Sequence, residues 1–214
     1  LYFAAGKLNL PGAMFTASHN PAEYNGIKLC LSGARPIGKE SGLLTIEKFV
    51  REGVPVSLRP IGIENHREML QDYVDHLLTL VDVSAIRKLN VVVDAGNGMA
   101  GHTAPAVFSR MNVEVTQMYY ELDGTFPNHE ANPIDEANLA DLKEMVKKKK
   151  ADIGLAFDGD ADRCFLVDEK GNAVNPSLLT ALIADRELQK KPGSPIIYNL
   201  ISSRAVKELS LIHI

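Results

Sequence analysis

Apolar and polar positions follow a regular pattern from residue 67 onward, first at helical and then at strand-like spacing. Between residues 67 and 82, apolar side chains recur every three or four positions, which predicts an amphipathic helix. We expect strands at 89–93, 113–120, 153–157, 164–167 and 196–200, and further helices at 102–111, 135–150 and 176–188. The alternation of strands and helices predicts an α/β fold.

The first 60 residues give a less regular pattern. A short apolar start leads into a stretch rich in Gly and Pro around Pro11 and Gly12, which we expect to be irregular. An apolar patch follows at 27–31, and the segment 43–50 has helix-like spacing. A long loop is expected at 121–133, a hairpin turn at 168–172 and a connection rich in Gly and Pro, KKPGSP, at 190–195.

The composition excludes several classes of protein. Hydrophobic residues make up 45% of the 214 residues and charged residues 23%, which is typical of a globular protein with a buried core. The 23 basic and 27 acidic residues give a net charge of −4, which argues against a nucleic-acid binder. No apolar stretch approaches the roughly 18 residues that a membrane span needs, and we find no signal-peptide layout. Two cysteines, Cys30 and Cys164, are too few for a disulfide scaffold and suit a cytoplasmic location.

Candidate chemistry is concentrated at residues 158–163, which read DGDADR between two expected strands. Like charges about 6 Å apart at an effective dielectric constant of about 20 cost on the order of 3 kcal/mol per pair. A divalent cation with oxygen ligands removes that cost, so Asp158, Asp160 and Asp162 are predicted to bind a metal ion. The alternative is a group of solvated loop carboxylates.

The same motif resembles the start of an EF-hand loop, and Glu169 falls at the twelfth position of that loop. Its sixth position is Arg163, however, where the EF-hand needs Gly, and strands rather than helices are expected on both sides. The EF-hand interpretation therefore fails. A guanidinium beside a metal ion suits a phosphate ester, so the motif indicates phosphoryl transfer.

A second candidate is the segment TASHNPAEYNGIKLC at 16–30. Pro21 and Gly26 are expected to give this loop a defined path, and Ser18 can then present its hydroxyl as a nucleophile. Neighbouring residues in a loop rarely face each other, so Ser18 and His19 are not expected to form a hydrolase-like pair. From residue types alone, a Ser18 that caps a turn and a Lys28 that faces solvent remain open alternatives.

Gly96, Gly98 and Gly101 match the G-x-G-x-x-G pattern between a strand and a helix. A tight strand-to-helix turn needs the same glycines, so nucleotide binding is the less favoured reading. In the loop DGTFPNHEANP at 123–133, Asp123, His129 and Glu130 include types that bind metals, but the DGDADR carboxylates are the better ligands. We therefore expect no nucleotide cofactor.

Together, these blocks resemble the α-D-phosphohexomutases, and within them the bacterial phosphomannomutase/phosphoglucomutase group. The resemblance rests on TASHNPAEYNGIKL at 16–29, VVVDAGNGMAG at 91–101, DGTFPNHEANP at 123–133 and DGDADR at 158–163, in the order and approximate spacing of the family. It implies mixed-sheet, three-layer α/β domains. It also implies that Ser18 is a phosphoserine and that Asp158, Asp160 and Asp162, with the Ser18 phosphate, bind Mg²⁺.

The resemblance assigns roles to three more residues and implies a reaction. Arg163 and Lys28 match positions that contact the active-site phosphate and assist proton transfer, and His19 matches the neighbour of the phosphoserine. The implied enzyme is a phosphotransferase isomerase of carbohydrate metabolism that interconverts hexose 6-phosphate and hexose 1-phosphate, of mannose or glucose, through a hexose 1,6-bisphosphate. The segment GARPIGKESGL resembles phosphomannomutase more than phosphoglucosamine mutase. The alternatives are a phosphoglucosamine mutase, a metal-dependent sugar-phosphate phosphatase, and a nucleotide- or sugar-phosphate-binding module built on Gly96–Gly101.

Family members have four domains and about twice this length, so we expect the chain to be a fragment. The expected domains are 1–65, a partial first domain with the phosphoserine loop; 66–174, a second domain with the metal loop; 175–208, the start of a third; and 209–214, a non-native tail, LSLIHI. Without the rest of the third domain and the fourth, we expect little or no turnover from this chain.

Overall fold

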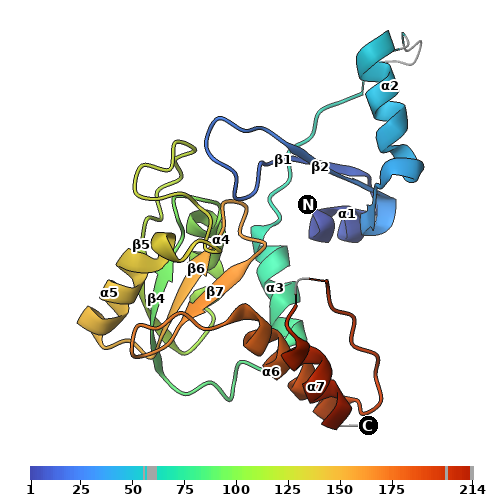
Figure 1. Ribbon diagram of the computed structural model, residues 1–214. Helices are drawn as coiled ribbons and strands as arrows, with labels where there is room; N and C mark the ends of the chain where they lie inside the picture. Colours follow the sequence, from blue (N-terminus) through green and yellow to red (C-terminus); the bar gives the residue numbers. More distant parts are fainter. Residues whose placement is uncertain (55, 57–61, 201, 213–214) are drawn as a thin grey trace. The chain divides into compact units, whose positions relative to one another are not determined.

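The computed structural model describes residues 1–54, 56, 62–200 and 202–212. It divides into two compact units, Leu1–Ala85 and Ile86–Ile214, and each is described by itself (Figure 1). Of the expected tail at 209–214, residues 213 and 214 and all side chains lie outside the described part. The backbone up to Ile212 belongs to a helix.

The first unit contains a small antiparallel sheet of order β1-β2-β3. Its elements are α1 (Tyr2–Leu8), β1 (Gly12–Phe15), β2 (Ile27–Leu31), η1 (Ser32–Ala34), β3 (Arg35–Pro36), η2 (Lys39–Leu43), α2 (Leu44–Glu52) and α3 (Leu70–Leu80). The patch at 27–31 and the helices at 43–50 and 67–82 are thus confirmed within a few residues. The expectation that the first residues are irregular was wrong, because α1 and β1 form there. Both are too short for a periodic pattern to stand out.

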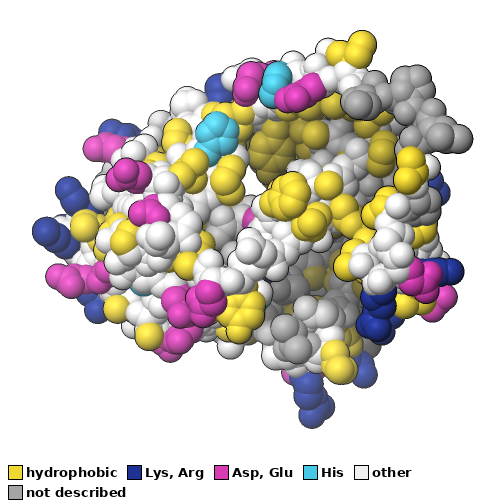
Figure 2. Space-filling view, turned by 90° about the horizontal axis from the view of Figure 1, so that it is seen from above, with side chains coloured by type: hydrophobic (Ala, Val, Ile, Leu, Met, Phe, Trp, Pro, Cys, Tyr) yellow, Lys and Arg dark blue, Asp and Glu magenta, His cyan; other side chains and the backbone are white. Residues whose placement is uncertain are grey.

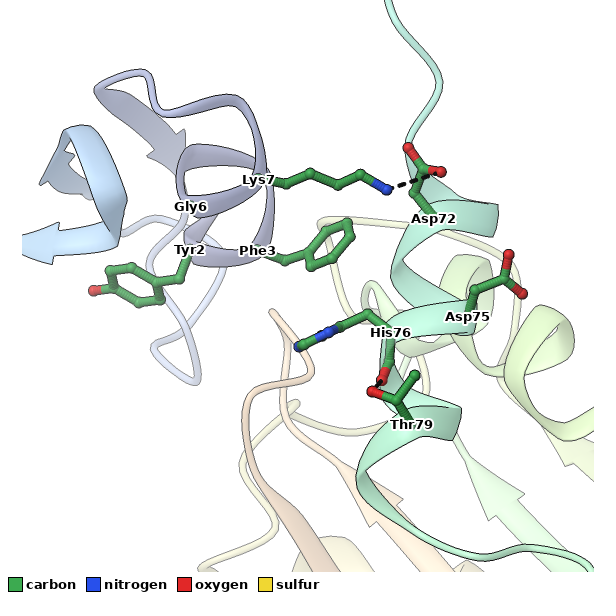
Figure 3. A pocket seen from close by; sticks show the side chains of 8 residues that line it. All are labelled: Tyr2, Phe3, Gly6, Lys7, Asp72, Asp75, His76 and Thr79. Atoms are coloured by element: carbon green, nitrogen blue, oxygen red, sulfur yellow. Dashed lines mark hydrogen bonds and ion pairs between the residues drawn. The ribbon is translucent and has the colours of Figure 1, made fainter.

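A pocket of about 590 Å³ lies between α1 and α3 (Figure 3). The Lys7 Nζ lies 3.1 Å from the Asp72 Oδ1, and the Phe3 ring packs against the ring of His76 at 5.2 Å. The lining residues are Tyr2, Phe3, Gly6, Lys7, Asp72, Asp75, His76 and Thr79. None of the residues for which the sequence predicts chemistry is among them.

The second unit is built on a mixed four-stranded sheet of order β5-β4-β6-β7 (Figure 1). Strand β4 pairs in parallel with β5 and β6, and β7 runs antiparallel to β6. Its elements are β4 (Leu89–Asp94), α4 (Ala100–Phe108), β5 (Val113–Met118), η3 (Glu136–Leu139), α5 (Ala140–Lys149), β6 (Ile153–Phe157), β7 (Cys164–Val167), α6 (Pro176–Lys190) and α7 (Arg204–Ile212). The mixed sheet confirms the expected α/β class.

The sheet order determines where the helices lie. The chain crosses from β4 to β5 and then returns past β4 to β6, so two right-handed crossovers place α4 and α5 on opposite faces. The α5 face forms a core in which Leu142 and Val146 pack with the sheet residues Val92 and Ala156. A Cβ at Gly154 would lie 2.7 Å from the Val146 Cγ2, so this position requires glycine for α5 to pack closely.

The expected strand at 196–200 does not form. The segment has no strand assignment, and Ile197 and Leu200 are 95% and 101% exposed. An apolar run becomes a strand only beside another strand that accepts its hydrogen bonds, and the described residues provide none here. The preceding helix forms as expected, with Pro176 in its first turn and Asn175 accepting a hydrogen bond from the Ser177 N–H.

Large apolar side chains remain on the surface of both units, and Figure 2 shows part of them among charged residues. They include Leu43, Leu44, Ile46, Phe49 and Val50 around α2. In the part of the chain that the structure describes, no helix combines the length and the apolar character needed to cross a membrane.

Tyr120, just after β5, has a buried hydroxyl without a hydrogen-bond partner among the described residues. Burial raises the pKa of Tyr120 to about 12. Because an unsatisfied buried polar group costs about 1 kcal/mol or more, we expect Tyr120→Phe to raise the free energy of unfolding by about 1 kcal/mol in urea denaturation. Its control is Tyr119→Phe, which removes a hydroxyl that donates to the Asp141 Oδ2 at 2.6 Å and should destabilise the fold. Lower stability of Tyr120→Phe would contradict this account.

Candidate functional site

The three aspartates of DGDADR lie together in the turn that joins β6 to β7. One carboxylate oxygen from each of Asp158, Asp160 and Asp162 lies within 4.8 Å of the others. The turn is tight: the Ala161 N–H donates to the Asp158 carbonyl at 2.9 Å, and Ala161 has a left-handed φ of 58°. Asp158 is fully buried, at 0% exposure. The predicted grouping of the three carboxylates is therefore present.

Arg163 is the near counter-charge of this cluster. Its Nη2 and Nε donate to the Asp158 Oδ2 at 2.6 and 2.9 Å, and its backbone N–H donates to the Asp158 Oδ1 at 3.0 Å. The Nε also lies 3.5 Å from the Asp162 Oδ1. The sequence predicts that Arg163 lies beside a metal ion. It does not predict that Arg163 hydrogen-bonds to both carboxylate oxygens of Asp158. The Arg163 side chain is 30% exposed.

The donors of this cluster are all carboxylate oxygens, which fits a hard divalent cation better than a zinc or copper ion. Three carboxylates against one guanidinium leave negative charge that such a cation would offset. The flanking elements are strands, as expected, and not the helices of an EF-hand. The cluster can therefore hold a metal ion, and it is the one such group among the described residues.

The glycine-rich turn after β4 packs directly against this loop. A Cβ at Gly98 would lie 2.6 Å from the Gly159 carbonyl oxygen, and a Cβ at Gly101 would collide with the Tyr120 carbonyl. The next amide, Met99 N–H, donates to the Gly159 carbonyl at 2.9 Å. These glycines are thus required for close backbone packing, which is the structural reading that the sequence favoured over nucleotide binding.

The loop at 121–133 contains an ion pair that the sequence did not predict. The His129 Nε2 lies 3.0 Å from the Oδ2 of Asp94, the last residue of β4, and its Nδ1 lies 2.9 Å from the Glu130 carbonyl oxygen. Asp123 instead accepts hydrogen bonds from the N–H and the hydroxyl of Thr125. The possible metal group of Asp123, His129 and Glu130 is therefore not formed. The one feature of the sequence that could have pointed to Asp94 is its place as an acidic residue directly after the apolar run VVV.

Ser18 lies in the loop between β1 and β2. The ends of this loop are joined by a hydrogen bond of 2.9 Å, which the Thr16 N–H donates to the Gly26 carbonyl. Ser18 has a left-handed φ of 59°, and its N–H donates to the Thr16 Oγ1 at 2.8 Å. The His19 Nδ1 lies 3.5 Å from the Ser18 Oγ. The expectation that neighbouring loop residues do not face each other was therefore wrong here, although 3.5 Å is long for a hydrogen bond.

Lys28 is half-buried on β2, in register with Met14 on β1. It lies at the end of the hairpin from which the loop of Ser18 and His19 projects. The first unit thus contains Ser18, His19 and Lys28, and the second brings Arg163 together with the three aspartates. Each set belongs to its own unit.

Comparisons with known proteins separate the same two sets of residues, although the model for the second set begins at residue 71 and so includes most of α3, which belongs to the first unit. A model of phosphoglucomutase/phosphomannomutase α/β/α domain I matches residues 1–54, and the model of domain II matches residues 71–171. Together they cover well over half of the chain. The chain belongs to the phosphoglucomutase/phosphomannomutase family. The first model contains the Ser18 loop and Lys28, and the second contains the aspartate cluster and Arg163.

Relatives in this family are similar over almost the whole chain. A phosphomannomutase of Vibrio cholerae is 37% identical over 205 residues, which is 93% of this chain and 44% of that protein. A protein of Xanthomonas campestris named for phosphohexose mutases is 38% identical over 200 residues, 93% of this chain and 45% of its own. The crystal structure of a family protein from Burkholderia thailandensis matches with a TM-score of 0.82 and 32% identity, over 98% of this chain and 47% of that one. The chain spans about half the length of the curated relatives it matches.

The ion pair between His129 and Asp94 predicts a pH dependence of stability. The hydrogen bond with Asp94 raises the pKa of His129 above its ordinary value of 6.5, against the opposing effect of burial. Because the folded pKa is the higher one, the stabilisation is complete below pH 6.5 and is lost as the pH rises through the folded pKa of His129. An NMR titration of His129 should give a pKa above 6.5, and Asp94→Asn should lower it. A pKa at or below 6.5 in the unaltered chain would refute this assignment.

Proposed function

We propose that the chain carries the phosphoryl-transfer residues of a phosphohexomutase, which interconverts hexose 6-phosphate and hexose 1-phosphate of mannose or glucose. The observation that carries the proposal is the cluster of Asp158, Asp160 and Asp162 beside Arg163. Such a site handles a phosphate ester by charge neutralisation and positioning. The names of the relatives, among them phosphomannomutase and phosphohexose mutase, support this substrate class.

In the proposed site, Asp158, Asp160 and Asp162 hold Mg²⁺ together with the phosphate of phosphoserine 18. When bound, the ion neutralises charge on the phosphate oxygens during transfer. A phosphoserine carries a charge of about −1.5 to −2 at pH 7, so the exposed part of Arg163 and the Lys28 ammonium stabilise the transferring group as well. His19, next to Ser18, helps to orient the serine.

The reaction we propose has two balanced steps. In the first, a free hydroxyl of the hexose phosphate attacks phosphorus, the bond to the Ser18 Oγ breaks, and a hexose 1,6-bisphosphate forms. The hydroxyl proton is transferred with the assistance of Lys28 and ends on the Ser18 Oγ. In the second step the bisphosphate has turned round, and the Ser18 Oγ attacks its other phosphorus. The bond from that phosphorus to the sugar oxygen breaks, and the serine hydroxyl proton passes to this oxygen. The isomeric monophosphate then leaves, with Ser18 phosphorylated again.

We also propose how the chain fits into the whole enzyme. Residues 1–65 correspond to part of the first domain, 66–174 to the second and 175–208 to the start of the third, with 209–214 as a non-native tail. Sugar recognition then needs further domains of the family, so the chain alone should have little or no turnover. Free thiols at Cys30 and Cys164 are compatible with a cytoplasmic enzyme.

The metal site can be tested on the chain itself. We expect Asp160→Asn to weaken Mg²⁺ binding in isothermal titration by on the order of 100-fold, because loss of even an outer-shell partner costs about 10- to 100-fold. The matched control is Glu169→Gln, which removes an exposed carboxylate from the same hairpin and should leave binding unchanged. Equal binding by the unaltered chain and Asp160→Asn would refute the proposed ligands.

The nucleophile can be tested by phosphate labelling. The full-length enzyme, incubated with ³²P-labelled hexose 1,6-bisphosphate, should carry label on Ser18. Ser18→Ala should lose both the label and the isomerisation of hexose phosphates, whereas Ser32→Ala, in the same unit, should keep both. Label at another residue would disprove the role of Ser18. Release of inorganic phosphate without an isomeric product would favour the phosphatase alternative instead.

A further inference from the structure

The aspartate loop is supported by a contact to the middle of its sequence. Gly159 lies between Asp158 and Asp160, and its carbonyl accepts the Met99 N–H at 2.9 Å. Gly98 lies so close that a Cβ there would come within 2.6 Å of the Gly159 oxygen and 2.9 Å of its Cα. These are main-chain atoms and have no rotamer through which to move away. The position of the turn at 95–99 therefore determines the position of Gly159.

Asp94 holds the turn at 95–99 in place. The side chain is 1% exposed, and its Oδ1 accepts the Gly96 N–H at 2.9 Å. Its other oxygen, Oδ2, lies 3.0 Å from the His129 Nε2. A buried carboxylate is stable only when its oxygens are satisfied, so the side chain is fixed from both sides.

His129 has acceptors at both ring nitrogens. The Nε2 faces the Asp94 carboxylate and the Nδ1 faces the Glu130 carbonyl, at 3.0 and 2.9 Å. A carboxylate oxygen and a carbonyl oxygen both accept hydrogen bonds, so a ring protonated at both nitrogens can donate to each of them. The side chain is only 15% exposed. The contact between His129 and Asp94 thus joins the loop at 121–133 to the end of β4.

We propose that Asp94 and His129 are positioning residues for the aspartate loop: the hydrogen bonds of this pair fix the turn at 95–99, which fixes Gly159 and so the separation of the carboxylates at 158 and 160. The positioning residues act through the Gly96, Met99 and Gly159 main chain. The inference rests on the proposed function, because the carboxylates are taken as the ligands of Mg²⁺.

The test compares two substitutions at Asp94 in the chain as it stands. Asp94→Ala removes both hydrogen bonds and should weaken Mg²⁺ binding about tenfold, the lower end of the effect of outer-shell partners. Asp94→Asn should keep nearly the original affinity. Its oxygen still accepts the Gly96 N–H, and its amide donates to the Nε2 of a neutral His129 whose Nδ1–H still reaches the Glu130 carbonyl.

A purely structural role would give a different result. If Asp94→Ala lowers the melting temperature but leaves the dissociation constant for Mg²⁺ unchanged well below that temperature, the proposal is overturned. Hydrogen exchange adds a local readout: the Met99 amide should lose protection in Asp94→Ala by more than the core strand β6 does. Equal loss at both places would also count against it.

A second pair of variants tests the proposal even if the Asp94→Ala variant does not fold. His129→Ala leaves the Gly96 hydrogen bond in place and should still weaken Mg²⁺ binding, with Gly124→Ala as the control in the same loop, where a Cβ meets no atom within 4 Å. Unchanged affinity in His129→Ala would overturn the role of His129. Failure of the proposed function is seen separately, as an unaltered chain that binds no Mg²⁺ or an Asp160→Asn variant that binds it equally well.

Discussion

The fully buried carboxylate of Asp158 is the constraint on which the second unit depends. An ionised carboxylate without a partner in a protein interior costs several kcal/mol, so the fold must bring a cation to it. Arg163, five residues after Asp158 in the chain, is this cation, and it donates three hydrogen bonds to the carboxylate from its guanidinium and backbone N–H. For Arg163 to reach back, the chain must reverse tightly between β6 and β7, and Ala161 adopts its left-handed conformation within that reversal.

The parallel pairing of β4 and β6 explains why this turn meets the glycine-rich one. Parallel strands end at the same edge of a sheet, so the residues that follow β4 and β6 emerge side by side. Two main chains approach there without intervening side chains, which is possible because Gly98 faces Gly159. The acidic residue at each strand end, Asp94 and Asp158, is buried and has its own basic partner, His129 and Arg163 respectively. The edge is therefore built from two ion pairs joined by backbone contacts.

Elements that repeat a pattern over many residues could be predicted from the sequence, and those defined by their neighbours could not. Helix α3 and the strands of the second unit have clear periodicity, whereas β1 is only four residues long and the run at 196–200 lacks a partner strand. The aspartate cluster was visible because its members alternate within five residues. The pair of Asp94 and His129 was not, because 35 residues separate the partners and only the loop path brings them together.

The serine loop shows that the other half of the candidate site is organised by its own unit. A left-handed backbone at a residue with a Cβ costs roughly 1–2 kcal/mol. Ser18 adopts this conformation, and its N–H donates a hydrogen bond to the hydroxyl of Thr16, two residues earlier. The loop closes where the Thr16 N–H meets the Gly26 carbonyl, and a Cβ at Gly26 would collide with the Thr16 carbonyl. Local strain at Ser18 is thus offset by contacts inside the hairpin. The geometry of the serine loop is therefore set by contacts within the first unit, just as the geometry of the aspartate loop is set by contacts within the second.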